Sequence, residues 1–334
     1  MNNIVNVKLP ENKSYDIIIG SNVLKDITKY INDICSTKHV ALITDQNVDK
    51  LYSSNLETLI KKNNIHFTKI ILPAGEKTKS FKYLEMVCNQ LLDAKIERND
   101  LIICLGGGVV GDLGGLAAGI ILRGIKLIHI PTTLLAQVDS SIGGKTAIDT
   151  KHGKNLVGIF NQPNMVIADL STLSSLPLRE IRSGYAEIVK YSLINDIDFF
   201  EWLEKNGESL INGNVNSIQY AVTSSCKTKA KIVSNDEKEL FNNRILLNLG
   251  HTFAHSIEKV CNYDNRIKHG EAVSIGLSLA FELSVNLGFC DEKDLKKVVN
   301  HLKSVKLPTD LSFLHNTLGC DELIEPILHD KKSK

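Results

Sequence analysis

The segment Leu101-Ile-Ile-Cys-Leu-Gly106-Gly107-Gly108-Val-Val-Gly111-Asp112 decides how the first half of this chain folds. An apolar run ends in consecutive glycines and a helical pattern follows, which predicts a buried strand, a tight turn and a helix. Gly106, Gly108 and Gly111 match the spacing G-x-G-x-x-G, in which the backbone approaches a pyrophosphate at a helix N-terminus. The acid that usually binds the ribose about 20 residues downstream is missing, because the next acid after Asp112 is Asp139. We interpret the turn as a dinucleotide site of non-standard arrangement, with a tight helix–sheet packing turn as the alternative.

Short apolar runs alternate with helix-period segments on both sides of this turn. The expected strands are Ile4–Leu9, Ile17–Ile19, Val40–Thr44, Thr68–Leu72, Leu101–Leu105, Leu127–Ile130 and Asn164–Asp169, and the expected helices cover 22–34, 47–63 and 80–95. Such alternation predicts a mostly parallel sheet with helices on both faces. From about Leu178 onward the pattern is that of successive amphipathic helices. The predicted fold is an α/β N-terminal domain with a mostly parallel nucleotide-binding sheet over residues 1–173, followed by an α-helical C-terminal domain over residues 174–334.

A histidine-rich segment in the second half has the residue types of a metal site. His251 and His255 lie four residues apart, so on a helix they share one face and form a pair of metal ligands. His269 follows in His-Gly-Glu271, and Glu187 offers a carboxylate in Ser-Gly-Tyr-Ala-Glu187. Two histidines and one glutamate that leave a coordination position open form a catalytic metal site. A lone histidine is more often packed in a core, but three in so short a segment favour the metal interpretation.

Other polar segments are candidates for ligand binding. The segment Asp139–Thr146 contains Gly-Gly-Lys-Thr but has Asp139 where a P-loop needs glycine, so an NTPase is excluded. This segment and Lys151–Asn155 are expected to be flexible loops that either carry function or merely connect. A further set of polar residues has spacings of four, three and four: Arg244, Asn248, His251 and His255. That spacing predicts a stripe on one helix that lines a site for an anionic ligand. Lys190 either contacts this ligand or forms an ordinary i,i+3 salt pair with Glu187.

Composition narrows the classes of protein that fit. A chain of 334 residues fits two domains, and its net charge of +1 argues against binding to nucleic acid or to a membrane surface. The seven cysteines are scattered and form no C-x-x-C pair, which indicates reduced thiols in the cytoplasm. The first residues show no signal-peptide pattern, and no apolar stretch reaches transmembrane length. This composition does not exclude a local basic pocket for an acidic small molecule.

Taken together, the motifs resemble those of the 3-dehydroquinate synthases, and the resemblance runs from about Thr44 to Lys332. The motifs that carry it are Pro73–Lys79, Gly106–Asp112, Pro131–Lys145, Lys154–Leu156, Gly184–Glu187, Leu247–Phe253, His269–Glu271 and Asp330–Lys332. So many separate motifs in one order are far more specific than any single one. The resemblance implies conversion of 3-deoxy-D-arabino-heptulosonate 7-phosphate (DAHP) to 3-dehydroquinate with release of phosphate, in the shikimate pathway.

The resemblance also implies roles for individual residues. One divalent metal, zinc or cobalt, would be bound by Glu187, His251 and His269, which moves His255 from the metal to the substrate phosphate. NAD, used catalytically, would contact Asp45, Ala74, Gly75, Glu76, Lys77, Thr78, Lys79, Gly108, Val109, Val110, Gly111, Asp112, Thr132, Thr133, Lys145, Lys154, Thr172, Leu173, Ser174 and Ser175. The substrate would contact Asp139, Lys145, Asn155, Lys190, Lys229, Arg244, Asn248, His255 and Lys331. Arg123 would reach the site of a neighbouring subunit, which implies a homodimer.

Other functions fit parts of the pattern. The alternatives are another sugar phosphate cyclase, a metal-dependent NAD alcohol or glycerol-phosphate dehydrogenase, and a homologue that only binds nucleotide. Retention of Lys190, Arg244 and Asn248 favours the synthase.

Two departures from the family pattern carry expectations. One extra residue lies near Phe241–Asn243, between Lys229 and Arg244. The sequence also has only Ser333 and Lys334 after Asp330–Lys332, where the family continues with a short β segment. We expect Lys331 to be ordered by the substrate itself and substrate binding to be weaker than in a chain with that segment.

Overall fold

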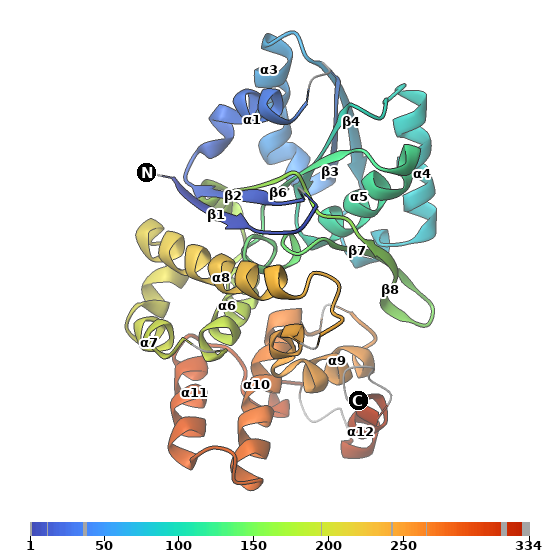
Figure 1. Cartoon of the computed structure of the whole chain (residues 1–334). Helices are drawn as coiled ribbons and strands as arrows, with labels where there is room; N and C mark the ends of the chain where they lie inside the picture. Colours follow the sequence, from blue (N-terminus) through green and yellow to red (C-terminus); the bar gives the residue numbers. More distant parts are fainter. Residues whose placement is uncertain are drawn as a thin grey trace. The chain divides into compact units, whose positions relative to one another are not determined.

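The chain folds into two compact units (Figure 1). The structure is a computed structural model that describes residues 2–328, except Asn12, 36–38, Asn195, Asn242, Asn265 and 315–318. The first unit comprises Met1–Ser175 and Cys226–Lys238, and the second comprises Leu176–Ser225 and Glu239–Lys334. Lys331, predicted to contact the substrate, lies outside the described residues.

The first unit is built on a seven-stranded sheet with the order β1-β2-β9-β6-β5-β3-β4. Only β1 is antiparallel to its neighbour, and every other pairing is parallel. The strands are β1 (Asn3–Val7), β2 (Tyr15–Gly20), β3 (His39–Asp45), β4 (His66–Leu72), β5 (Leu101–Gly106), β6 (Lys126–Pro131) and β9 (Met165–Asp169). The predicted mostly parallel sheet is confirmed, and each expected strand has its counterpart.

Helices cover both faces of this sheet, as the alternation of strands and helices predicted. The helical segments are η1 (Val23–Asp26), α1 (Ile27–Ile34), α2 (Gln46–Val48), η2 (Asp49–Ser53), α3 (Ser54–Lys62), η3 (Glu76–Thr78), α4 (Phe81–Asp93), α5 (Gly108–Ile120), η4 (Ile121–Arg123), η5 (Ala136–Ser140) and η6 (Leu170–Ser175). Successive residues of β3 point to opposite faces: Ile43 packs with α4 and α5, and Leu42 packs with α1 and α3. The chain changes face between β4 and β5, so the strand order reverses between β3 and β5. In open α/β sheets, ligands bind at the carboxyl ends of the strands at such a reversal.

The glycines of α5 allow this helix to lie very close to the strands beneath it. A Cβ atom at Gly114 would lie 2.4 Å from the Cys104 sulfur, and one at Gly115 would lie 2.5 Å from the Thr146 methyl group. Gly114 and Gly115 therefore allow close packing of the helix. Close helix–sheet packing was the alternative interpretation of the glycine-rich turn. The earlier Gly107 and Gly108 form the turn itself, where β5 ends and α5 begins.

The two segments expected to be flexible loops, Asp139–Thr146 and Lys151–Asn155, each end in a strand of a β-hairpin, and Asp139 and Ser140 end η5. Strands β7 (Lys145–Thr150) and β8 (Gly153–Phe160) form an antiparallel two-stranded sheet. The expectation of loops was wrong for the residues that belong to the strands, because the polar and glycine residues obscured two short β-forming runs, Thr-Ala-Ile and Leu-Val-Gly-Ile-Phe. Gly158 allows the strands to approach, since a Cβ atom there would lie 2.1 Å from the Thr146 carbonyl oxygen.

The second unit is helical. Its segments are α6 (Leu178–Leu193), α7 (Ile197–Ile211), the first part of α8 (Val215–Asn235), η7 (Asn243–Asn248), α9 (His251–Val260), α10 (His269–Asn286), α11 (Glu292–Ser304), η8 (Leu311–Leu314) and α12 (Cys320–Leu328). Helix α10 packs against α6, α9 and α11. The division differs from the sequence-based one, which placed everything after residue 173 in the second domain. Residues Cys226–Lys238 group with the first unit, because the Cys226 thiol lies 3.4 Å from the Gln137 carbonyl oxygen and Lys229 binds Asp139.

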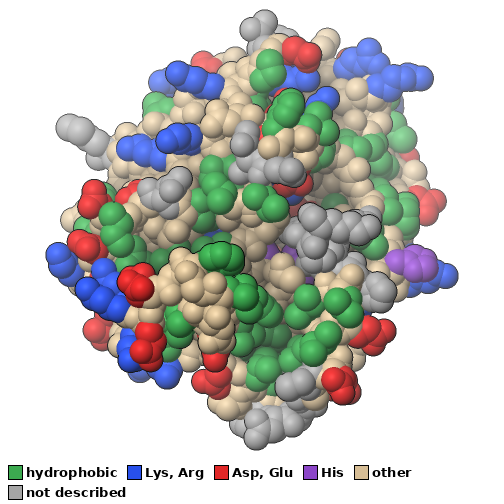
Figure 2. Space-filling model, turned by 60° about the horizontal axis from the view of Figure 1, so that its bottom comes forward, with side chains coloured by type: hydrophobic (Ala, Val, Ile, Leu, Met, Phe, Trp, Pro, Cys, Tyr) green, Lys and Arg blue, Asp and Glu red, His purple; other side chains and the backbone are tan. Residues whose placement is uncertain are grey.

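Charges of both signs are interspersed on the face drawn in Figure 2 rather than gathered by sign, in keeping with the net charge of +1. Among the described residues, no helix is both long and apolar enough to cross a lipid bilayer.

Two buried histidines lead us to expect a loss of stability in acid. Burial lowers the pKa of His129, on β6, to about 4 and that of His301, on α11, to about 4. Between pH 6.5 and 4 the unfolded chain binds a proton at each position and the folded chain does not, so stability falls as the pH drops. The loss approaches about 3 kcal/mol for each histidine at pH 4. Urea unfolding of the unmodified protein across this range measures it.

Substitution of one histidine separates its part of this effect. In His129→Gln, the unfolding free energy should fall by about 3 kcal/mol less between pH 6.5 and 4, because one of the two histidines no longer contributes. His152, which is exposed, supplies the control His152→Gln, whose slope should match that of the unmodified protein. An unchanged slope in His129→Gln would show that His129 is not the acid-sensitive group.

Candidate functional site

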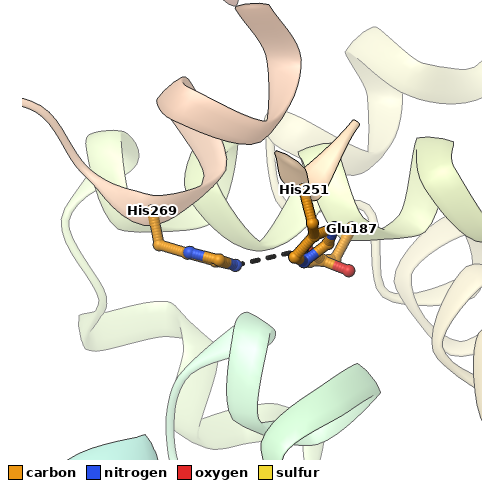
Figure 3. Close-up of side chains that lie close together, drawn as sticks. All are labelled: Glu187, His251 and His269. Atoms are coloured by element: carbon orange, nitrogen blue, oxygen red, sulfur yellow. Dashed lines mark ion pairs between the residues drawn. The ribbon is translucent and has the colours of Figure 1, made fainter. Parts of the chain in front are cut away.

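Three side chains from three helices of the second unit meet at one point (Figure 3). Glu187 lies on α6, His251 is the first residue of α9 and His269 is the first residue of α10. Their candidate ligand atoms all lie within 4.8 Å of one another. The Nε2 atoms of both histidines lie 3.4 Å from Glu187 Oε1. The structure thus brings together the three residues that the resemblance implies as metal ligands.

Close helix packing fixes this meeting point. A Cβ atom at Gly270 would lie 1.9 Å from the Ser183 carbonyl oxygen on α6, and one at Gly276 would lie 2.1 Å from the Gly250 carbonyl oxygen. Gly250, which precedes α9, has a φ of 76°, in the left-handed region that glycine adopts most readily. Helix α10 can therefore approach both α6 and α9 only because these positions are glycine.

The loop before His269 is held by an ion pair. Arg179 on α6 donates to both carboxylate oxygens of Glu271, with Nε–Oε1 and Nη2–Oε2 distances of 2.7 Å. Its Nη2 also donates to the Arg266 carbonyl oxygen at 2.9 Å, and Glu271 accepts the Lys268 backbone N–H at 2.8 Å. In the motif His-Gly-Glu, the histidine is thus the candidate ligand, the glycine permits the contact with α6, and the glutamate fastens the loop.

The charges at this point favour a cation. Glu187 is fully buried, and burial alone would raise its pKa, but Lys190, His251 and His269 hold that pKa well below its ordinary value. Burial and the neighbouring Lys190 lower the pKa of His251. Burial opposes protonation of His269 as well, yet Glu258 and Glu187 raise its pKa to about 10. A proton held this firmly between two carboxylates marks a position where positive charge is stabilised.

These residues fit a divalent metal ion. Both carboxylate oxygens of Glu187 are buried, and among the described residues neither accepts a hydrogen bond of standard geometry. They are approached instead by charged groups, the Lys190 ammonium and the two imidazoles. A buried carboxylate beside two imidazole nitrogens is the donor set of catalytic zinc sites.

Two expectations drawn from helical spacing are wrong. His255 lies one turn after His251 on α9, with its ring 5.4 Å from that of His251, but within the described part of the chain it is outside the candidate metal cluster. Arg244 and Asn248 belong to η7, and the chain turns at Gly250 before α9 begins. The polar stripe therefore does not lie on one helix. Segment η7 ends at Asn248, and Gly250, in a left-handed conformation, separates it from α9.

In the first unit, a second cluster surrounds Lys79, which is buried. The Lys79 ammonium lies 2.8 Å from Asp112, 3.6 Å from Glu76 and 3.8 Å from Asp149, and it donates to the Asn155 side-chain oxygen. Burial opposes protonation of Lys79, but these carboxylates raise its pKa. Burial raises the pKa of Asp112 to about 6, and Lys79 limits that rise.

Asp149 is a member of this cluster that sequence reasoning missed. Its carboxylate accepts the backbone N–H of Asn155 at 2.9 Å, and its own N–H donates to the Lys79 carbonyl oxygen at 2.9 Å. Asn155 has a φ of 56°, so Asp149 helps to hold it in a left-handed conformation. No sequence motif indicated Asp149, because it lies between the two polar segments that sequence reasoning singled out.

Most other residues predicted to contact NAD follow the carboxyl ends of the parallel strands. Asp45 ends β3 and caps α2 by accepting the backbone N–H groups of Asn47 and Val48 at 2.8 and 3.2 Å. The positions predicted beside it are Ala74, Gly75, Glu76, Lys77, Thr78 and Lys79 after β4, Gly108, Val109, Val110, Gly111 and Asp112 at the start of α5, and Thr132 and Thr133 at the end of β6. Thr172, Leu173, Ser174 and Ser175 lie in η6 after β9, where the Tyr52 hydroxyl donates to the Thr172 carbonyl oxygen.

The residues predicted to contact the substrate lie in both units. In the first unit, Lys229 donates to the Asp139 carboxylate at 2.6 Å, and Lys145 begins β7. In the second unit, Lys190 is buried against Glu187 and 4.9 Å from the centre of the Tyr191 ring, and Arg244 is buried with its Nε 3.6 Å from Glu239.

In sequence comparison, two models of one family match this chain one after the other. The model described as "3-dehydroquinate synthase N-terminal" matches residues 69–183, and that described as "3-dehydroquinate synthase C-terminal" matches residues 184–333. A 3-dehydroquinate synthase of Rhizobium meliloti (strain 1021) is 49% identical over 332 residues, which is 99% of this chain and 87% of the relative. One of Agrobacterium fabrum (strain C58 / ATCC 33970) is 47% identical over 333 residues, which is 99% of this chain and 88% of the relative.

Solved structures agree at the level of the fold. A 2-deoxy-scyllo-inosose synthase complexed with carbaglucose-6-phosphate, NAD⁺ and Co²⁺ is 26% identical, with a TM-score of 0.87 over 99% of this chain and 88% of the other. A 2-epi-5-epi-valiolone synthase from Streptomyces hygroscopicus with NAD⁺ and Zn²⁺ bound is 25% identical, with a TM-score of 0.86 over 97% and 88%. A glycerol dehydrogenase from Schizosaccharomyces pombe, 18% identical with a TM-score of 0.74 over 95% and 83%, shares the fold alone.

Proposed function

The chain belongs to the 3-dehydroquinate synthase family, and we propose that it converts DAHP to 3-dehydroquinate with release of phosphate. This is a carbon–oxygen lyase reaction of the shikimate pathway, which leads to the aromatic amino acids. The observation that carries the proposal is the meeting of Glu187, His251 and His269, with buried Lys190 beside them. Packing of helices alone would not require a fully buried carboxylate, because burial of a charge costs free energy even when the charge is paired.

The proposed cofactors are NAD and one divalent metal ion, zinc or cobalt. Glu187, His251 and His269 would hold the metal, which when bound polarises substrate oxygens and stabilises negative charge on them. NAD, when bound, accepts a hydride from a secondary hydroxyl and returns it within the same cycle. The related synthases whose structures contain NAD⁺ with Co²⁺ or Zn²⁺ support both cofactors.

We assign NAD binding to the first unit. The support is the reversal of strand order between β3 and β5, with Asp45 ending β3 and the Gly106–Gly108 turn ending β5. The first backbone N–H groups of α5 would face the pyrophosphate. Lys79 would orient Asp112 beside the cofactor and Asn155 toward the substrate, because its ammonium contacts both side chains.

Anion binding is the role proposed for the polar residues of the second unit. Lys190, Arg244, Asn248 and His255 would bind the carboxylate and phosphate of DAHP. Charge-assisted hydrogen bonds to such groups contribute roughly 1.5–3 kcal/mol each. Lys190 would bind the substrate close to the metal, because its ammonium contacts the proposed metal ligand Glu187. Lys145, Asp139 and Lys229 are proposed substrate contacts from the first unit.

The assay that tests this function incubates the protein with DAHP, NAD⁺ and Zn²⁺ or Co²⁺. We expect phosphate and 3-dehydroquinate in equal amounts, no accumulation of NADH, and loss of turnover when a chelator removes the metal. NADH that accumulates in step with product would show a dehydrogenase instead. Turnover of a different phosphorylated sugar in place of DAHP would show another sugar phosphate cyclase.

We propose that the protein acts as a homodimer through the outer side of the hairpin and the end of α5. Strand β8 exposes Leu156, Val157, Ile159 and Phe160, and among the described residues it pairs with β7 alone. The end of α5 packs beside it, since a Cβ atom at Gly119 would lie 2.3 Å from the Ile159 side chain. Ile120 and Leu122 add exposed apolar surface there. An apolar patch along a strand at the edge of a sheet is typical of an interface.

This surface would also deliver Arg123 to the partner subunit. Arg123 follows the exposed Leu122, and both have left-handed backbone conformations with φ of 66° and 49°. Arg98 holds this turn by donating to the Leu122 carbonyl oxygen through Nε and Nη2, at 3.2 and 3.0 Å. These hydrogen bonds hold the turn from which the Arg123 side chain would extend across the proposed interface.

Charge placed on this surface tests the dimer. In Phe160→Lys combined with Ile120→Lys, we expect monomers in sedimentation and at least tenfold lower activity, because desolvating two lysines opposes association and Arg123 no longer reaches its target. The matched control is Ile4→Lys, at an exposed apolar residue of β1, which should leave mass and activity unchanged. A double variant that stays dimeric would place the interface elsewhere.

We propose a cytoplasmic location. Six cysteines, Cys35, Cys88, Cys104, Cys226, Cys261 and Cys290, are free thiols in the structure, which suits a reducing compartment.

A further inference from the structure

His269 is contacted by a carboxylate on each side of its ring. Its Nε2 lies 3.4 Å from Glu187 Oε1, in the candidate metal cluster. Its Nδ1 lies 3.3 Å from Glu258 Oε2, and Glu258 is buried. Because the two ring nitrogens point in different directions, a carboxylate at Nδ1 is not placed to share an ion with Nε2. Glu258 is accordingly absent from the cluster formed by Glu187, His251 and His269.

The other histidine has the same arrangement with a different acceptor. The Nδ1 of His251 lies 3.2 Å from the Leu249 carbonyl oxygen, and its Nε2 lies 3.4 Å from Glu187 Oε1. Both imidazoles therefore present Nε2 to the cluster and turn Nδ1 toward an oxygen acceptor. An acceptor at Nδ1 keeps the proton on that nitrogen and leaves Nε2 free to bind a metal.

We propose that Glu258 is the positioning residue of the metal site, which fixes the ring orientation and tautomer of His269 without binding the ion. The proposal rests on the metal-dependent function proposed above. His251 obtains its acceptor from the backbone, which no side-chain substitution removes. The acceptor for His269 is a side chain, so a substitution of Glu258 can change how tightly His269 binds the metal while all three proposed ligands stay in place.

Helix α9 carries both His251 and Glu258, so it contributes to the position of both histidine ligands. Glu258 lies seven residues after His251 on α9, so both side chains project from the same face, two turns apart. Helix α9 thus supplies one candidate ligand at its first residue and the orienting carboxylate for the ligand on α10. A carboxylate acceptor, unlike a carbonyl, also makes the imidazole more basic and so a stronger ligand.

The test measures metal affinity rather than turnover. In Glu258→Ala, the dissociation constants for Zn²⁺ and Co²⁺, from competition with a chromophoric chelator, should rise about 10- to 100-fold. In Glu258→Gln the rise should be smaller, because the amide oxygen still accepts from Nδ1 but carries no charge. The Co²⁺ absorption spectrum of Glu258→Ala should change, and excess metal should restore turnover.

The matched control is Asp100→Asn, which removes a buried carboxylate 3.7 Å from Nδ1 of His39, in the first unit. It should leave metal affinity unchanged. Thermal unfolding of the metal-free proteins identifies any variant that fails to fold, and Glu258→Gln then supplies the affinity measurement. A merely structural role for Glu258 would lower the melting temperature and leave the affinity of the folded protein unaltered.

The outcomes separate this inference from the function on which it rests. If the unmodified protein binds one metal per chain and both Glu258 variants bind it as tightly, the positioning role is refuted and the proposed function stands. If the unmodified protein binds no metal and does not convert DAHP, the proposed function fails, and the positioning role with it.

Discussion

Replacing His269 by alanine is expected to remove the metal and the activity together. The substitution leaves two of the three candidate ligands, Glu187 and His251, and opens the cluster on the side of α10. Stabilisation of transition-state charge by a metal is worth several kcal/mol, and each 1.36 kcal/mol is tenfold in rate. We therefore expect activity to fall by a factor of about 1,000 or more. Metal content by plasma mass spectrometry should fall from one ion per chain to near zero.

The control for this experiment is His152→Ala, at an exposed histidine of the turn between β7 and β8. It should retain both metal and activity. If His269→Ala still holds one ion per chain after dialysis, the metal site does not include His269.

Gly270→Ala should be among the most damaging single-methyl additions in the second unit. The added Cβ would lie 1.9 Å from the Ser183 carbonyl oxygen and 2.5 Å from its carbonyl carbon, both backbone atoms of α6. Alanine in place of glycine inside a helix gains about 1 kcal/mol from propensity, but overpacking costs typically 1–3 kcal/mol and here must move a helix. We expect a net loss of at least about 2 kcal/mol in urea unfolding, and weaker metal binding because His269 moves with α10.

Gly319 provides the comparison for this substitution. A Cβ atom there would meet nothing closer than 3.7 Å, so Gly319→Ala should leave stability nearly unchanged. Equal stability of the Gly270 and Gly319 variants would mean that α6 and α10 do not approach as closely as the structure has them.

The sheet could be predicted from the sequence because its strands are buried on both faces. Runs such as Leu101–Leu105 are apolar without interruption, and glycine or proline ends them. The hairpin β7–β8 could not be predicted in this way, since β8 is exposed along most of its length and carries no burial pattern. A strand whose apolar residues point to solvent lacks the alternation on which sequence reasoning depends.

Prediction from sequence patterns was limited in the same way at the candidate site. Helical spacing joined His255 to His251, because spacing describes neighbours on one helix only. The third ligand, His269, comes from another helix, and it was found through the His-Gly-Glu motif of a known family rather than through geometry. Glu258 and Asp149 were missed, because a residue that supports a functional side chain is identified by contact, and contacts between elements are not visible in a sequence.

His251 and His269 are each the first residue of a helix, and this has a consequence for the order of binding. The N-terminal end of a helix carries about half a positive elementary charge. The two helix ends, together with the Lys190 ammonium, therefore roughly offset the carboxylates of Glu187 and Glu258. In the metal-free protein the further positive charge at this point is the single proton on His269, whose pKa is raised to about 10, whereas the ion replaces that proton with a double charge. Loading of the metal should thus precede capture of a doubly anionic sugar acid, so that the empty protein does not retain phosphorylated metabolites that it cannot convert.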